Sequence, residues 1–277
     1  MKNYIYIAIL SLFCFGCQEV IDIELDDAPP RLVIDAYFNI FNNEETGAYL
    51  YTEGGVLLSL SAPYFDDEIP SVSNATVYIT NLETNEVINF IESATLGRFI
   101  PENGASFQPD FDTNYELTVI YDNETYNSTV QYIPAVPIDK LEQGDGVLFE
   151  GNEIEVKIFY TDLSPRVDFY LFDLDFDLFL PSEDTFYQGQ DFNFSYFYED
   201  DDVMGSEIDI KILGIDQDYY NYFNLILEQD QDDGNPFQTA PALIRGNIVN
   251  TSNGDNFPFG FFRISEVYTK SITVVEQ

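Results

Sequence analysis

FDTNYELTVIYDNETYNSTVQYI, at residues 111–133, is the part of the sequence that says most about the fold. Residues 115–121 and 126–133 are rich in aromatic and β-branched side chains, which is typical of strands. The short polar segment at 121–125 is typical of a tight hairpin turn. We therefore predict two neighbouring antiparallel strands here.

The same strand signals extend toward the N-terminus, at 32–38, 56–61, 75–80 and 86–91, with a second tight turn at 81–85. Short strands at regular intervals are typical of a β-sandwich. Tyr115, just inside its strand, resembles the tyrosine corner of immunoglobulin-like and fibronectin-like domains. We predict a mainly β protein whose N-terminal domain, residues 31–137, is an immunoglobulin-like β-sandwich.

Pro134 and Pro137 mark a predicted domain boundary, because proline cannot occupy a central strand. The remainder, 138–277, is predicted to be a β-rich domain with one amphipathic helix near 216–228. Asp216 is the expected N-cap of this helix. Strands are predicted at 153–161, 167–180, 242–249, 260–267 and 268–275.

The N-terminus predicts export and lipid attachment. Lys2 precedes an apolar run at 4–15, which is long enough for a secretory signal and too short to span a bilayer. Gly16 followed by Cys17 resembles the junction of a bacterial lipoprotein signal, so residues 1–16 are predicted to be removed and Cys17 acylated. The acidic segment 17–30, with Pro29 and Pro30, is the predicted tether. A secreted protein with an incidental cysteine remains the alternative.

Composition narrows the possible functions. The 10 Lys and Arg residues face 50 Asp and Glu, for a net charge of −40, so nucleic acid is not an expected partner. Histidine is absent from the sequence, which excludes Ser-His-Asp triads, Cys-His pairs and histidine metal ligands. Lipid attachment would occupy the cysteine of the mature chain. We therefore predict a protein that is not an enzyme and needs no cofactor.

Asp173, Asp175 and Asp177 alternate with apolar residues within the predicted strand 167–180. Alternate strand positions share one face, so this pattern indicates a solvated face, a site for a hard cation such as calcium, or a site for a basic ligand. The acidic loops at 199–202 and 230–234 depart from the twelve-residue calcium loop. No pair among the carboxylates is singled out by its spacing as a glycosidase site.

The aromatic tract at 186–198 includes Tyr196, Phe197 and Tyr198. Flat rings of this kind either pack in a core or form a surface for a ligand or partner. Both interpretations of these three residues remain open.

Two stretches of the chain carry a family resemblance. The opening Cys17-Gln-Glu-Val-Ile-Asp-Ile-Glu-Leu, followed by Pro30-Arg-Leu-Val-Ile-Asp-Ala36, is similar to the start of a family of Bacteroidota outer-membrane lipoproteins known only as a domain of unknown function, DUF4249. Gly234-Asn-Pro-Phe237, Arg245-Gly-Asn-Ile248 and Gly260-Phe-Phe262 resemble its C-terminal pattern.

The resemblance implies a lipid-anchored outer-membrane protein that faces the cell exterior. Such lipoproteins are often associated with TonB-dependent transporters, which implies a non-enzymatic binding or accessory role in nutrient capture. A structural or assembly subunit of an outer-membrane complex and a calcium-dependent adhesin are the alternatives. The family contributes no catalytic residues.

Overall fold

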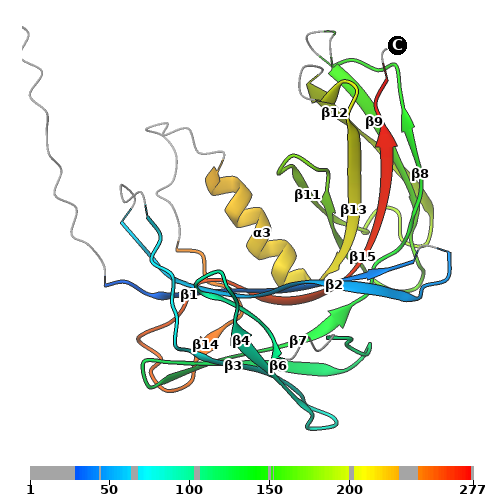
Figure 1. The fold of residues 1–277 in the computed structure, drawn as a ribbon. Coiled ribbons are helices and arrows are strands. Elements are labelled where there is room, and N and C mark those ends of the chain that lie inside the picture. Colours follow the sequence, from blue (N-terminus) through cyan, green and yellow to red (C-terminus); the bar gives the residue numbers. More distant parts are fainter. Residues whose placement is uncertain are drawn as a thin grey trace, which may run out of the picture.

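The computed structural model is built around the long strands β1, β2 and β15 (Figure 1). The structure describes residues 29–43, 45–63, 68–102, 107–148, 151, 153–199, 203–230 and 243–275. Its elements, in chain order, are β1 (Leu32–Asn42), β2 (Tyr49–Leu60), β3 (Thr76–Asn81), β4 (Val87–Glu92), β5 (Arg98–Pro101), β6 (Asn114–Tyr121), β7 (Glu124–Ile133), β8 (Ile138–Gln143), β9 (Glu153–Thr161), β10 (Phe169–Asp173), β11 (Phe179–Glu183), β12 (Asp191–Glu199), β13 (Glu207–Ile215), α3 (Gln217–Asp230), β14 (Val249–Asn250) and β15 (Phe262–Thr273).

Among the described residues, eight strands close into a barrel in the order β1-β2-β5-β4-β3-β6-β7-β15. Closure depends on β15, which pairs in parallel with β1 from Ala36↔Phe262 to Phe41↔Val267. The same strand also pairs in parallel with the end of β7, at Ile264↔Tyr132. A strand from the end of the chain therefore completes a barrel whose other strands lie before residue 134.

The prediction of an immunoglobulin-like sandwich is wrong, although the prediction of a mainly β fold is confirmed. The predicted hairpin forms, since β6 and β7 pair from Asn114↔Gln131 to Tyr121↔Glu124. The hydroxyl of Tyr115 also accepts a hydrogen bond from the backbone N–H of Asp110 at 2.8 Å, as in a tyrosine corner. These local features fit both folds, and the distant strand β15 decides between them.

Curvature of the barrel wall is provided by β2, at Gly54 (φ 122°) and Gly55 (φ 147°). A Cβ atom on Gly54 would lie 2.0 Å from the backbone oxygen of Tyr37 in β1. Only glycine permits this close approach, and glycine kinks are a common device for bending a sheet into a barrel.

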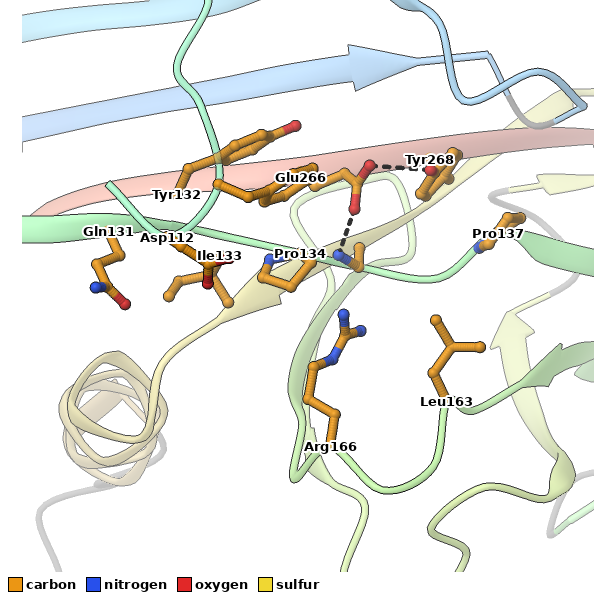
Figure 2. Close-up of a pocket in the computed structure, with 12 residues that line it drawn as sticks. Asp112, Gln131, Tyr132, Ile133, Pro134, Pro137, Leu163, Arg166, Glu266 and Tyr268 are labelled. Carbon is orange, nitrogen blue, oxygen red and sulfur yellow. Dashed lines mark hydrogen bonds between the residues drawn. The ribbon is translucent and has the colours of Figure 1, made fainter. Parts of the chain in front are cut away.

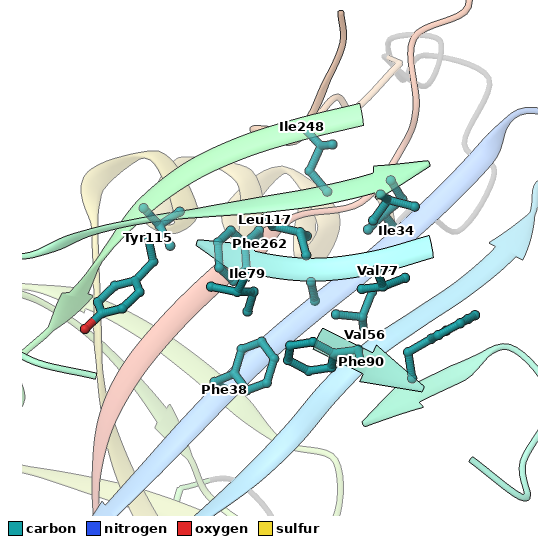
Figure 3. Close-up of a cluster of buried hydrophobic side chains, with 14 of the residues drawn as sticks. Ile34, Phe38, Val56, Val77, Ile79, Phe90, Tyr115, Leu117, Ile248 and Phe262 are labelled. Atoms are coloured by element: carbon teal, nitrogen blue, oxygen red, sulfur yellow. The ribbon is translucent and has the colours of Figure 1, made fainter. Parts of the chain in front are cut away.

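Side chains fill the barrel interior (Figure 3). Phe38 of β1 is 1% exposed and makes edge contacts with Phe90 of β4, Phe107 and Phe262 of β15, with ring centroids 5.7, 4.9 and 6.3 Å apart. Such edge-to-face pairs add to the stability gained from burying apolar area. The barrel is therefore a packed core.

A second layered unit continues from the barrel through β15, which Figure 1 shows in red. Beyond the barrel, β15 pairs with β13, and β10 and β11 extend this sheet. The sheet β12-β9-β8 packs against it around a second buried cluster that includes Ile158, Tyr160, Phe172 and Ile210. The strand β15 belongs to both units. The predicted C-terminal domain, 138–277, therefore supplies one strand of the barrel, and the predicted N-terminal domain, 31–137, supplies the others.

The helix predicted near 216–228 is confirmed as α3. The carboxylate of Asp216 accepts a hydrogen bond from the N–H of Tyr219 at 2.7 Å, which is the expected N-cap. Tyr219 and Phe223 pack against a small cluster that includes Phe41 and Leu213. Within the described part of the chain, no helix has the length and apolarity that a membrane crossing requires.

Candidate functional site

A pocket of about 480 Å³ lies where the barrel meets the second unit (Figure 2). The end of β7 and the segment after it, the loop before β6, the loop after β9, and β15 all contribute to its wall. Its lining includes Phe111, Tyr132, Arg166, Glu266 and Tyr268. The volume is within the range of small-molecule sites in proteins.

Glu266 forms a fixed acidic part of the wall and is only 6% exposed. Its Oε1 accepts hydrogen bonds from Asn42 Nδ2 at 2.7 Å and from the Tyr268 hydroxyl at 2.9 Å. Its Oε2 accepts one from the N–H of Ala135 at 2.8 Å. Three donors thus compensate the burial of this carboxylate.

Two tyrosine hydroxyls border Glu266. Burial, with a contribution from the nearby Glu266 charge, raises the pKa of Tyr132 and of Tyr268 well above the usual range. Both hydroxyls therefore remain protonated at neutral pH. Tyr268 donates to Glu266, and Tyr132 accepts from Asn42 at 3.2 Å.

Arg166 is the one cationic residue among the described residues that line the pocket. Its Nε donates to Asp168 Oδ1 at 2.5 Å, whereas its buried Nη2 has no hydrogen-bond partner among the described residues. A buried donor without an acceptor lowers stability. A bound molecule can contact the exposed part of the side chain, which is 35% of it.

Phe111 provides a flat apolar surface at the pocket. It stacks on Tyr132 with a centroid distance of 4.2 Å and an interplanar angle of 7°, yet remains 46% exposed. A second pocket, of about 330 Å³, is also lined by Phe111 and Tyr132. A ligand can therefore contact the Phe111 ring and also reach the polar groups of the pocket wall.

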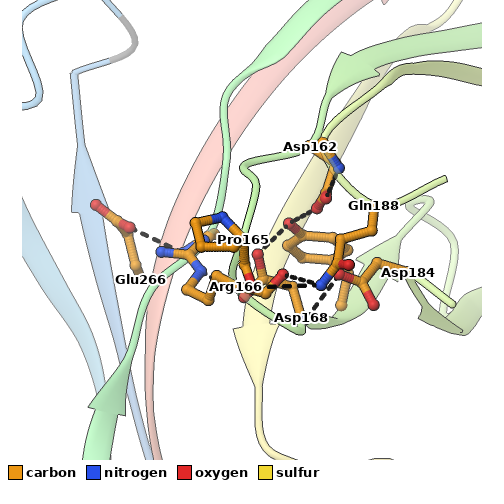
Figure 4. A network of polar contacts seen from close by, with 10 residues as sticks. Asp162, Pro165, Arg166, Asp168, Asp184, Gln188 and Glu266 are labelled. Atoms are coloured by element: carbon orange, nitrogen blue, oxygen red, sulfur yellow. Dashed lines mark hydrogen bonds and ion pairs between the residues drawn. The ribbon is translucent and has the colours of Figure 1, made fainter.

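Arg166 belongs to a network of polar contacts that includes buried carboxylates (Figure 4). Asp162, Asp168 and Asp184 are 2%, 5% and 1% exposed, and their oxygens lie within 4.8 Å of one another. The Tyr170 hydroxyl lies 2.6 Å from Asp162 and 3.0 Å from Asp168, and Asp162 also accepts from the N–H of Gly189 at 2.7 Å.

The network joins two loops. Asp184 Oδ2 accepts from the N–H of Asp168 at 3.0 Å, and Gln188 Nε2 donates to the backbone oxygen of Arg166 at 2.8 Å. Burial raises the pKa of Asp184, and the charges of Asp162 and Asp168 raise it further. Because every one of the three carboxylates already accepts hydrogen bonds from the protein, we assign this cluster the role of positioning Arg166.

The three aspartates predicted to share a strand face do not do so: Asp173 ends strand β10, and Asp175 and Asp177 lie on the turn that follows. The prediction of one continuous strand at 167–180 is wrong, since β10 ends at Asp173, β11 begins at Phe179, and residues 175, 176 and 177 between them have φ of 67°, 51° and 59°. Asp173 Oδ2 accepts from Lys211 Nζ at 2.8 Å, and Asp175 Oδ2 from the N–H of Asp209 at 3.1 Å. Within the described part of the chain, Asp173, Asp175 and Asp177 do not bring their carboxylates as close together as Asp162, Asp168 and Asp184 do. Calcium binding here stays a prediction.

The predicted aromatic surface lies on β12. Tyr198 is 3% exposed and donates to the backbone oxygen of Leu174 at 2.8 Å, so it belongs to the core. Tyr196 is half-buried and packs edge-on against Tyr198 at 4.8 Å, and Phe197 is also half-buried. Their role toward a partner stays a prediction. Cys17, the predicted lipid site, lies outside the described residues.

Sequence reasoning missed the pocket residues because they come from four separate segments. One signal was present: Arg166 is a rare cation within the acidic segment Asp162-Leu-Ser-Pro-Arg-Val-Asp168. Nothing local connects that arginine with Phe111 or Glu266.

Comparison with known proteins identifies the family. The family model of DUF4249, a domain of unknown function, matches residues 18–271. A comparison with curated proteins found no match for this sequence. Because the family match covers nearly the whole chain, the protein belongs to the DUF4249 family.

Proposed function

We propose that this protein is a non-enzymatic ligand-binding subunit, held at the outer membrane through a lipid on Cys17, that works with a TonB-dependent transporter in nutrient capture. The pocket beside Arg166 is the observation that carries the proposal. It combines a volume of about 480 Å³, an exposed aromatic ring and a partly exposed cationic side chain. Sites for small molecules commonly combine apolar walls with a few convergent polar groups.

The lining indicates the chemistry of the ligand. Arg166 favours a carboxylate, phosphate or hydroxyl oxygen, since a guanidinium only donates hydrogen bonds. Phe111 favours a flat or apolar face next to that group. The ligand we propose is therefore a small polar molecule with one acceptor group near one flat face.

The pocket favours capture over a purely structural role, because a scaffold has no need for a cavity lined by an exposed aromatic ring and a cationic side chain. The structural subunit remains the main alternative. The calcium-dependent adhesin stays a prediction from the sequence.

Blocking the pocket tests ligand binding. Leu163 lines the pocket and is 52% exposed, so tryptophan at this position fills space without entering the core. We expect Leu163→Trp to lower the small-molecule content of the protein purified from its source cells by about tenfold or more, the usual effect of overfilling a packed site. Native mass spectrometry measures this content.

The matched control is Val167→Trp, on the same loop and 66% exposed but outside the lining. It should retain the bound molecule. Equal ligand content in the wild type and in Leu163→Trp would contradict the proposed site. A transporter that co-purifies from mildly solubilised membranes, with no ligand in any form of the protein, would favour the structural alternative.

Lipid attachment is tested separately at Cys17. We expect Cys17→Ser to abolish incorporation of an alkyne-tagged fatty acid and to move the protein from the membrane to the soluble fraction, because the acyl chains supply the membrane affinity. Cys14→Ser is the matched control and should keep the label. Labelling that survives in Cys17→Ser would exclude this anchor.

A further inference from the structure

Arg31, near the start of the described chain, and Arg245 stack on the ring of the same residue, Phe257. The guanidinium carbon of Arg31 lies 3.7 Å from the centroid of the Phe257 ring, and that of Arg245 lies 3.4 Å from the same centroid. Two guanidinium groups cannot share one face of a ring at these distances, so they occupy opposite faces. A guanidinium this close to a ring contacts it through its flat side, which leaves its N–H edges available.

Neither arginine is neutralised by an acid within the described residues. The ion pairs found there are Lys140–Glu142, Lys157–Glu155, Arg166–Asp168 and Lys211–Asp173. Arg31 Nη1 instead donates to the backbone oxygens of Asp255 and Phe257 at 3.1 and 3.2 Å. Arg245 is exposed, and its guanidinium contacts the Phe257 ring.

This pairing is unusual in a chain with 50 acidic and 10 basic residues. Like charges on the two faces of one ring repel each other, and a bound anion would remove that repulsion. Arginine is well suited to phosphate because its N–H groups match the spacing of two phosphate oxygens. The local charge therefore points to an anionic group.

The position of the pair relative to the tether suggests the source of that anion. Arg31 follows Pro30 directly and precedes β1, so the chain leads from this site toward Cys17. A fully extended chain spans about 3.5 Å per residue, which places this site within about 50 Å of the lipid attachment point. This step rests on the lipid anchor proposed above.

We propose that Arg31, Phe257 and Arg245 form a binding site for the phosphate of an anionic membrane lipid. The site holds this face of the protein against the membrane, while the acidic remainder of the surface is repelled from it. The tether then limits the distance from the membrane and the arginine pair sets the orientation, so the pocket is presented in a defined direction.

The test places the full mature chain on vesicles through an N-terminal hexahistidine tag in place of the lipid, on nickel-chelating lipid. Gly254→Cys carries a fluorophore, because a side chain there meets no other atom within 4 Å and lies near Phe257 in sequence. Energy transfer to a dye in the bilayer reports how close this face is to the membrane. Vesicles contain either phosphatidylglycerol or only phosphatidylcholine as the remaining lipid, at physiological ionic strength.

We expect more transfer on phosphatidylglycerol than on phosphatidylcholine. Arg245→Gln should lower the ratio of membrane-apposed to detached protein on phosphatidylglycerol by about fivefold, the usual effect of one arginine near an anionic surface. Arg245→Lys should retain part of the difference. Arg98→Gln is the matched control: Arg98 is also exposed, its guanidinium donates to the backbone oxygen of Gly54, and the substitution removes the same charge.

Equal transfer on the two kinds of vesicle would overturn the proposal, as would an equal loss in Arg98→Gln and Arg245→Gln. Inorganic phosphate serves as the competing source of the same chemistry. If millimolar phosphate releases the protein as fully as Arg245→Gln does, the site takes free phosphate and the lipid assignment is wrong. Because the artificial anchor replaces Cys17, none of these failures bears on the pocket or on lipid attachment.

Discussion

We expect Phe38→Ala to lower the free energy of unfolding by about 4 kcal/mol, within the usual range for a buried phenylalanine. The ring is 1% exposed and touches three other rings from different parts of the barrel wall. Alanine would leave a cavity at the point where β1, β4 and β15 meet. Because those strands belong to a closed barrel, the surrounding wall has little freedom to collapse into the space.

Chemical denaturation of the mature chain measures this effect, and thermal unfolding should show a decrease in Tm of about 10 °C. Phe186→Ala is the matched control, because Phe186 is 89% exposed. It should change stability by less than about 0.5 kcal/mol. A similar loss in both variants, or none in Phe38→Ala, would contradict the packed interior.

The sequence predicted the parts of the fold that depend on neighbouring residues. The hairpin β6–β7 and the helix α3 with its Asp216 cap are both set by local patterns, and both are confirmed. Closure of the barrel depends on pairing between Ala36 and Phe262, which are far apart in the chain. A strand pattern indicates a strand and gives no partner, so the same strands fitted a sandwich equally well.

The aspartates at 173, 175 and 177 show the same limit of a strand pattern within one short segment. Alternation of polar and apolar residues suits a strand, and aspartate also tolerates a positive φ better than most residues. The chain here turns back on itself, and Asp173 and Asp175 bond to β13 in place of forming a row. The pocket was harder still to foresee, because Arg166 is positioned by carboxylates from two loops.

The same chemical change at two of those carboxylates should have opposite effects. Asp168→Asn removes the charge that pairs with Arg166 Nε, while Asp184→Asn removes a charge with no cationic partner among the described residues. We expect Asp168→Asn to lower the free energy of unfolding by about 2 kcal/mol, less than for a fully buried pair because 35% of the Arg166 side chain is exposed. We expect Asp184→Asn to raise it at neutral pH.

The sign for Asp184 follows from its pKa. Burial raises the pKa of this carboxyl above the ordinary 3.8, so the folded protein binds the proton more tightly than the unfolded chain does. Stability then falls as the pH rises through the interval between the unfolded and folded values, and the full penalty applies above it. Asparagine has no such penalty, and its side-chain oxygen still accepts from the N–H of Asp168.

Urea denaturation of the wild type and both variants across pH measures the difference. The gain from Asp184→Asn should be largest at neutral pH and should vanish below the unfolded value of 3.8, where the wild-type carboxyl is neutral in both states. A gain that did not depend on pH would show that repacking, and not charge, causes it. If Asp184→Asn destabilised the protein at neutral pH as Asp168→Asn does, the ionised Asp184 would have a cationic partner, and an ion bound among the three carboxylates would be the first to look for.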